Sequence, residues 1–154
     1  MSDTLLVATD GSISSRQAVS VGLSLARERK ARVRFVHCSP TISRTLFARD
    51  PYTLATAEEV ASMDPALRES LEQAQQAGVD ADLTLLGEHG TSSVATAIVG
   101  TAQGLGATMV VVGARGRGAI TEAMLGSVSR MVMRMSDVPV IVVHSPEGTE
   151  ESTF

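Results

Sequence analysis

Two segments of the chain combine glycine and serine at spacings that suit the binding of phosphate groups. Gly113 and Gly116 form the first segment, and after nine intervening residues the second consists of Gly126, Ser127, Val128 and Ser129. Glycine lets backbone N–H groups come close to an anion, and a helix start offers unpaired amides with a partial positive charge. The alternative interpretation is that the glycines form ordinary turns and the serines ordinary helix caps.

The chain between these two segments is long enough for both of them to reach one polyphosphate. Each residue spans up to about 3.3 Å when extended, so residues 117–125 impose little restriction on where the two segments meet. Arg115 and Arg117 place positive charge next to the first segment, where an anion would be held.

A second candidate group follows the first apolar run and consists of Ala8, Thr9, Asp10, Gly11 and Ser12. An acidic residue at a strand end can accept hydrogen bonds from a sugar hydroxyl or help to hold a metal ion. The alternative is a turn that starts at Asp10, with Ser12 or Ser14 capping the next helix. Both groups are expected at the carboxyl ends of strands, where open α/β sheets bind their ligands.

Several other nucleotide and catalytic motifs are absent from the sequence. There is no GxxxxGK[ST] loop, and a GxGxxG motif beginning at Gly116 would have Thr121 at its third glycine position. The histidines lie far apart, and neither HExxH nor CxxC occurs. Cys38 lacks the neighbouring base that a nucleophile needs. These absences favour a binding site without a catalytic nucleophile.

The elements that position these residues follow from five runs rich in β-forming residues, separated for the most part by helical patterns. The runs cover residues 4–9, 32–38, 81–86, 108–112 and 138–143. The helical patterns cover 14–31, 64–78, a segment capped by Thr91 or Ser92 and ending near 106, and 126–135. Such alternation predicts an α/β fold with a parallel sheet and helices on both faces.

The runs differ in the place that each is expected to take in the sheet. The first and fourth contain unbroken apolar stretches, which is typical of central strands. The third alternates apolar residues with Asp80, Asp82 and Thr84, which predicts an edge. The fifth, from Val138 to Val143, is uncharged and contains Pro139, so it also suits an edge and indicates pairing with a second copy of the chain.

Apolar spacing predicts the buried faces of two helices. The predicted faces are Ala18, Val21, Leu25 and Ala26 in the first helix, and Val128, Met131, Val132 and Met135 in the last. Residues 39–63 do not fit the pattern, and only 57–62 resemble a helical turn, so a long loop is expected there.

Composition limits the classes of protein to which the chain can belong. Its 154 residues, 44% of them apolar, predict one domain over residues 1–145 and a flexible acidic tail over 146–154. A net charge of −4 and an aromatic content of 3% disfavour nucleic acid as a partner. The absence of a long apolar stretch predicts no membrane insertion, and a single cysteine suits the cytoplasm.

The first and second glycine segments together spell a recognisable signature. Gly113-x2-Gly116-x9-Gly126-Ser127 resembles the G-2x-G-9x-G-[ST] motif of the ATP-binding members of the universal stress protein family. VATDGS, VRFVHC and GSVSRMVMRMSDVPVIVV are similar to that family's first strand and turn, its second strand, and its closing helix and strand. The resemblance covers residues 3 to 144.

The resemblance implies a Rossmann-like open sheet of five parallel strands in the order 3-2-1-4-5, and a homodimer formed through the last strand. It also implies that Asp10 contacts the ribose of ATP, that Ala8 and Thr9 line the adenine side, and that Cys38 lies against the base. The residues that it places around the phosphates, with Mg²⁺ or Mn²⁺, are Gly113, Arg115, Gly116, Gly126, Ser127, Val128 and Ser129. Cys38 departs from the family pattern, which has an aliphatic residue there.

A nucleotide-dependent stress-response or regulatory protein is the function that this resemblance favours, with an unidentified regulatory partner. Binding does not imply turnover, because fast phosphoryl transfer needs a positioned base or water-orienting group. Two alternatives stay open: a slow ATPase acting on metal-bound ATP, and a nucleotide-free dimerisation module whose glycines are structural.

Overall fold

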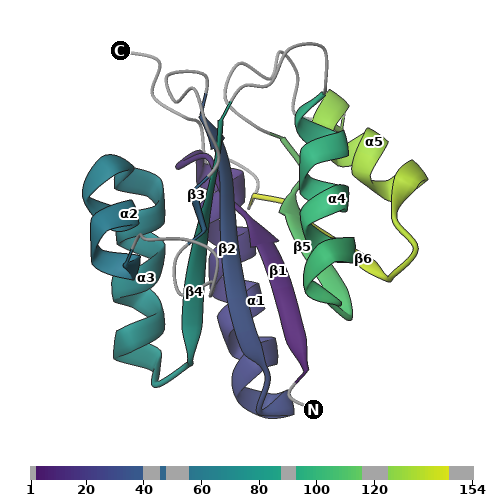
Figure 1. The fold of residues 1–154 in the computed structure, drawn as a ribbon. Helices are drawn as coiled ribbons and strands as arrows, with labels where there is room; N and C mark the ends of the chain where they lie inside the picture. The colour runs from purple at the N-terminus through teal and green to yellow at the C-terminus, as the bar shows by residue number, and fades with distance from the viewer. Residues whose placement is uncertain (1–2, 40–45, 48–55, 88–92, 116–124, 146–154) are drawn as a thin grey trace.

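An open β-sheet lies at the centre of the computed structural model, which describes residues 3–39, 46–47, 56–87, 93–115 and 125–145 (Figure 1). The described strands are β1 (Thr4–Ala8), β2 (Arg32–Ser39), β3 (Leu46–Phe47), β4 (Ala81–Gly87), β5 (Met109–Gly113) and β6 (Val140–Val143). Their order in the sheet is β3-β4-β2-β1-β5-β6, and each neighbouring pair is parallel except β3 with β4. The predicted α/β class and the 3-2-1-4-5 order of the five predicted runs are confirmed, and β3 is an addition.

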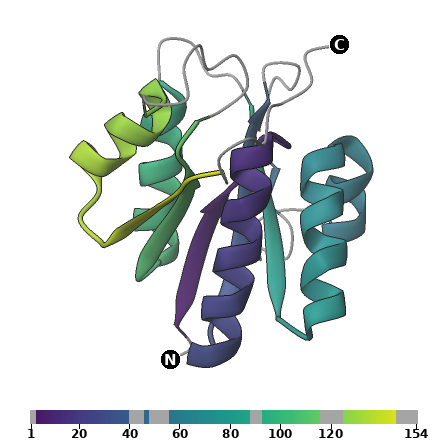
Figure 2. The same cartoon turned by 180° about the vertical axis from the view of Figure 1, so that it is seen from behind.

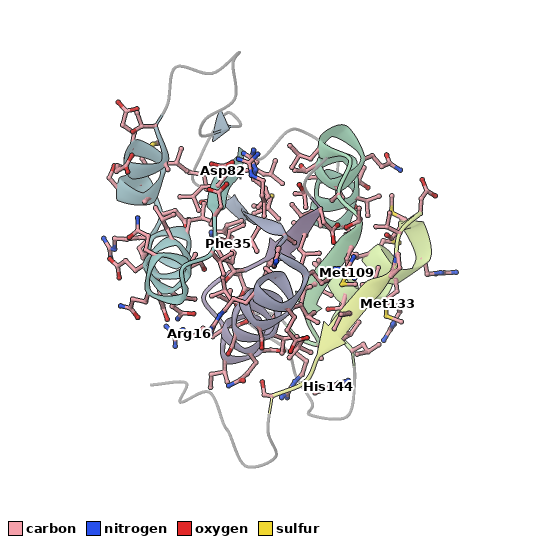
Figure 3. All side chains as sticks on the ribbon, turned by 90° about the horizontal axis from the view of Figure 1, so that it is seen from below. Arg16, Phe35, Asp82, Met109, Met133 and His144 are labelled. Carbon is pink, nitrogen blue, oxygen red and sulfur yellow. The ribbon has the colours of Figure 1, made fainter. Side chains whose placement is uncertain are left out.

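Helices cover both faces of the sheet. They are α1 (Ile13–Arg29), α2 (Ala57–Met63), α3 (Pro65–Ala77), α4 (Val94–Leu105) and α5 (Ser127–Met135). The first three pack on one face and the last two on the other, as the front and back views show (Figures 1 and 2). Figure 3 looks at the molecule from below and shows Phe35, which is fully buried, near the middle of the sheet.

The central position of β1 follows from its apolar residues. Leu5, Leu6 and Val7 have no exposed surface, and β1 has a parallel neighbour on each side. A Cβ atom added to Gly22 of α1 would lie 2.6 Å from Val7 Cγ2, so only glycine allows α1 to lie this close to the strand. The predicted central place of the first and fourth runs is confirmed.

Side chains define where the helices begin. The Ser12 hydroxyl accepts the Ser15 N–H at the start of α1, the Asp64 carboxylate accepts the Leu67 N–H at the start of α3, and Ser93 caps α4. The predicted caps Thr91 and Ser92 lie outside the described residues. Gly78 and Gly106 end α3 and α4 with positive φ angles, which glycine adopts without strain.

Two predicted helix faces need correction. In α1 the buried apolar residues are Ala18, Val19, Leu23 and Ala26, whereas Val21 and Leu25 are only half-buried. In α5 the prediction was wrong for all but one residue: Val132 is fully buried, but Val128, Met131 and Met135 are 36%, 43% and 37% exposed. The other buried residue of α5 is Ser129, which is 4% exposed. Its hydroxyl donates a hydrogen bond to the Gly113 carbonyl at the end of β5.

The predicted loop over residues 39–63 also needs correction. Its described part contains β3 and the whole of α2, which begins with a reciprocal cap between Thr56 and Glu59. β3 lies antiparallel to β4, so β4 is not the edge that its alternating polar residues predicted. Every residue of β4 is buried, including Asp82 and Thr84.

Charged side chains connect the elements at the amino ends of the strands. Arg29 of α1 forms an ion pair with Asp3 at 2.6 Å, and Arg32 of β2 forms one with Asp80 at 2.9 Å. The Thr108 hydroxyl also donates a hydrogen bond to Asp3. These donors, Thr108 first and Arg29 second, hold the pKa of Asp3 below its ordinary value.

Asp64 joins three elements, α2, α3 and β2. It ends α2, caps α3, and lies 2.7 Å from Nδ1 of His37 in β2. Burial raises the pKa of Asp64, but the hydrogen bonds from His37 and from the Leu67 N–H outweigh burial and leave this pKa below its ordinary value.

None of the helices in the described ranges is both long and apolar enough to span a bilayer.

Candidate functional site

The candidate site lies where the chain leaves β1 and β5. These two strands are neighbours, and the connections leave β1 and β5 toward opposite faces of the sheet, with β2 on one side of β1 and β5 on the other. In doubly wound sheets, the ligand crevice forms at the carboxyl ends of two neighbouring strands whose connections leave toward opposite faces. The carboxyl ends of the parallel strands point toward the end of the molecule opposite the N-terminus (Figure 1).

The turn after β1 is held by a network of hydroxyl groups. The Asp10 carboxylate accepts the Ser12 N–H at 2.9 Å, and the Ser15 hydroxyl accepts the Asp10 N–H at 3.3 Å. Thr9 is 5% exposed and its hydroxyl lies 3.2 Å from that of Ser15, while its N–H donates to the Val36 carbonyl of β2. Gly11 has a φ of 81°, which lets the chain turn directly into α1. The turn thus presents Asp10 in a defined, half-buried position.

The start of α1 also packs directly against the end of β5. A Cβ atom at Gly113 would lie 2.7 Å from the Ser14 carbonyl carbon and 2.8 Å from Ser15 N, so this approach requires glycine. The Ser14 hydroxyl accepts the Arg115 N–H at 3.3 Å and donates to the Val143 carbonyl at 3.1 Å. Ser14 was predicted only as a possible helix cap, and the serines around the turn were the one signal of this contact.

The two glycine segments meet at the start of α5. The Gly126 N–H donates to the Ala114 carbonyl at 2.7 Å, and the Ser129 hydroxyl donates to the Gly113 carbonyl at 2.5 Å. The first helical hydrogen bond of α5 runs from the Arg130 N–H to the Gly126 carbonyl. The N–H groups of the first turn therefore have no acceptor within the helix, and they lie next to the end of β5. These are the N–H groups of Ser127, Val128 and Ser129.

The remaining predicted residues are distributed as follows. Ala8 ends β1, and Cys38 lies near the end of β2, two residues beyond Val36, the register partner of Ala8. Both Ala8 and Cys38 are half-buried, and Arg115 is half-buried beside Ser14. Gly116 lies outside the described residues, as do Arg117 and the tail over 146–154.

The described residues do not form a cage for a metal ion by themselves. Within the described ranges no three His, Cys, Asp or Glu side chains come together as ligands. Asp10 is the carboxylate of the turn after β1.

The chain is similar to known proteins of one family. A model described as the universal stress protein family matches residues 1–144. Universal stress protein YxiE of Bacillus subtilis is 28% identical over 93% of this chain and 99% of its own length. A universal stress protein of Mycolicibacterium smegmatis is 32% identical over 93% of this chain, which spans about half of that relative, 48%.

A solved structure shares both the fold and part of the sequence. It is the crystal structure of a universal stress protein in complex with cAMP, with 27% identity and a TM-score of 0.68. The match covers 94% of this chain and 98% of that one.

Proposed function

Because this chain belongs to the universal stress protein family, we propose that it binds ATP at the carboxyl ends of β1 and β5 and acts as a nucleotide-dependent regulatory protein in a stress response. The coarser part of the proposal, an adenine nucleotide at this site, is supported by the related structure that holds cAMP. ATP in particular is supported by the glycine and serine spacing from Gly113 to Ser127.

One observation supports the proposal more than any other: the two glycine segments are joined by a hydrogen bond. The Gly126 N–H binds the Ala114 carbonyl at 2.7 Å, so the first-turn amides of α5 lie beside the residues that follow β5. Amides at a helix start attract phosphate through their unpaired N–H groups and the helix dipole. The N–H groups of Ser127, Val128 and Ser129 would donate to a polyphosphate. Gly113, Arg115, Gly116 and Gly126 would surround it, while the N–H groups of Arg115 and Gly126 stay bonded to Ser14 and Ala114.

The nucleoside would occupy the β1 side of the crevice. Asp10 is held in place by the Ser12 N–H and can accept hydrogen bonds from a ribose hydroxyl. Ala8, Thr9 and Cys38 would line the adenine side, with Cys38 against the base. A Mg²⁺ or Mn²⁺ ion would arrive with the phosphates and neutralise part of their charge.

We infer binding without rapid turnover. Phosphoryl transfer needs a base or a water-orienting group beside the γ-phosphate. In the described turn after β1 the carboxylate is Asp10, and we assign it to the ribose. Phosphate release in the presence of ATP, lost on Asp10→Ala, would instead support the alternative of a slow ATPase.

We also propose that β6 pairs with β6 of a second copy. β6 is the last strand of the described sheet, and its residues are half-buried and uncharged. The carbonyls of Pro139 and Val143 accept N–H groups of β5 and its extension, so Val140 and Val142, which alternate with them, direct their backbone groups outward. An uncharged edge of this kind favours pairing with another strand.

We place this dimer in the cytoplasm, where ATP is abundant and a lone cysteine stays reduced.

The proposal is tested by calorimetric titration with ATP and, separately, with tripolyphosphate, both with Mg²⁺. Asp10→Asn keeps an oxygen for the turn but loses the charge that favours the ribose, so ATP affinity should fall about tenfold while tripolyphosphate affinity stays unchanged. Asp80→Asn, at an exposed ion pair, is the matched control and should bind both ligands as the wild type does. Failure of the wild type to bind millimolar ATP would refute the proposal.

A further inference from the structure

Ser14 is the point at which three elements distant in the sequence share one buried side chain. It is the second residue of α1 and is 4% exposed. Its hydroxyl donates to the carbonyl of Val143, the last residue of β6, and accepts the N–H of Arg115, which follows β5. A serine hydroxyl has one proton to donate, so its single donor is committed to β6 while its acceptor side serves the loop after β5.

The end of β6 is held to the same loop by a second bond. The Val143 carbonyl also accepts the N–H of Ala114 at 2.8 Å. The two donors to this carbonyl are therefore Ala114 and Ser14, and Ala114 in turn accepts the Gly126 N–H through its own carbonyl. A continuous chain of hydrogen bonds runs from the start of α5, through the end of β5, to the end of β6.

The start of α1 cannot move toward β5, because Gly113 already lies against it. A Cβ atom added at Gly113 would lie 2.7 Å from the Ser14 carbonyl carbon, which shows that strand and helix are in direct contact. Figure 3 shows the end of β6, marked by His144, beside α1. A change in the position of the Arg115 backbone must therefore alter the bond between Ser14 and Val143.

The neighbouring serine has a different set of partners. The Ser15 hydroxyl bonds to Thr9 and to the Asp10 N–H, so it serves the turn after β1. Ser15 thus supports the side of the crevice proposed for the nucleoside, and Ser14 connects the side proposed for the phosphates to β6.

We propose that Ser14 is a positioning residue that couples ATP bound in the crevice to the end of the edge strand β6. This inference rests on the proposed function, because it requires a ligand that orders the backbone at Arg115. ATP bound to the first-turn amides of α5 orders this backbone, which stabilises the Arg115–Ser14–Val143 chain of hydrogen bonds and with it the strand that pairs with a second copy. Linkage makes the effect reciprocal, so pairing at β6 strengthens ATP binding by the same factor.

Amide hydrogen exchange measured by NMR, with and without saturating Mg²⁺–ATP, tests the coupling. In the wild type ATP should slow exchange of the Ala114 and Val143 amides about fivefold, the lower limit of common coupling strengths. In Ser14→Ala this effect of ATP should disappear. Ser70→Ala is the matched control, because Ser70 is 3% exposed and its hydroxyl donates to the Ala66 carbonyl within α3. It should retain the full effect.

The outcomes separate this inference from the proposed function. ATP that binds the wild type by calorimetry without slowing exchange at Ala114 and Val143 overturns the coupling and leaves the binding site intact. An undiminished effect of ATP in Ser14→Ala overturns the role of Ser14. Failure of the wild type to bind ATP overturns the proposed function and the coupling together. A merely structural role of Ser14 would speed exchange equally with and without ATP, which also contradicts the inference.

Discussion

Gly113 carries a steric requirement that can be tested without any ligand. A Cβ atom there would meet the backbone of Ser14 and Ser15 at 2.7–2.8 Å, and backbone cannot rotate away as a side chain can. We expect Gly113→Ala to lower the free energy of unfolding by about 1–3 kcal/mol, measured by urea denaturation. Gly100→Ala, in open space on α4, should raise it by about 0.5–1 kcal/mol. Equal changes in the two variants would contradict the close packing of α1 on β5.

Asp64 gives the molecule a component of stability that depends on pH. Its pKa is lowered from the ordinary 3.8 because hydrogen bonds from His37 and the Leu67 N–H outweigh burial. A carboxyl of this kind stabilises the fold above its unfolded pKa, and the contribution is lost as the pH falls through the folded pKa. The advantage of the wild type over Asp64→Asn should therefore be full above about pH 4 and should shrink below it.

Urea unfolding at a series of acidic pH values measures this advantage. Asp80→Asn serves as the control, since an exposed ion pair contributes little to stability and should show a much smaller dependence on pH. An advantage of the wild type over Asp64→Asn that grows as the pH falls would have the wrong sign for this mechanism.

Residue types indicated which two glycine segments lie together, but they did not indicate which side chains support them. Glycine and serine spacing indicated that the segments at Gly113 and Gly126 belong together, and the structure joins them by a hydrogen bond. The bridging role of Ser14 could not be predicted, because its partners Arg115 and Val143 are about a hundred or more residues away. A hydroxyl's partner depends on tertiary packing, which spacing along the chain does not record.

At the scale of the element, α5 shows why apolar periodicity alone is an incomplete guide. The buried side of α5 contains Ser129, whose hydroxyl bonds to Gly113, so the helix is held by a polar contact as well as by Val132. Methionines 131, 133 and 135 are 43%, 49% and 37% exposed. A stripe of apolar residues predicts the buried face only where burial is purely hydrophobic.

This orientation of α5 predicts very different costs for two neighbouring substitutions. Val132→Ala removes methyl groups from a fully buried position and should lower the free energy of unfolding by about 2 kcal/mol. Met131→Ala, at an exposed position, should change it by less than about 0.5 kcal/mol. Urea denaturation at low protein concentration compares the two. A larger loss for Met131→Ala would place that residue, as its spacing predicted, inside the core.

The two-residue strand β3 is the element that the sequence failed to reveal. α2 was indicated only as a helical turn over 57–62 inside a predicted loop. The reciprocal cap between Thr56 and Glu59 was a further signal for the start of α2. β4 was predicted at the edge because Asp82 and Thr84 are polar, yet both are buried, and Asp82 forms an ion pair with Arg34 of β2.

At the scale of the whole molecule, the outward backbone of β6 allows a test of assembly that spares the monomer. Val142 directs its N–H away from β5, so Val142→Pro removes a donor from the free edge without breaking the bonds to β5. We expect the wild type to sediment as a dimer and Val142→Pro as a folded monomer. Val142→Ala keeps the N–H group and should remain dimeric. A dimer in all three proteins would show that the chains associate elsewhere.

The ion pairs at the amino end of the sheet and the bonds of Ser14 beside the candidate site differ in exposure. Arg29 pairs with Asp3 and Arg32 with Asp80 near the protein surface, whereas the Ser14 hydroxyl is buried and neutral. Electrostatic screening shortens from about 10 Å at 0.1 M salt to about 3 Å at 1 M, and it acts on exposed charges far more than on buried dipoles. A rise in salinity should therefore weaken the Arg29–Asp3 and Arg32–Asp80 pairs, while the buried hydrogen bonds of Ser14 beside the proposed site keep their strength.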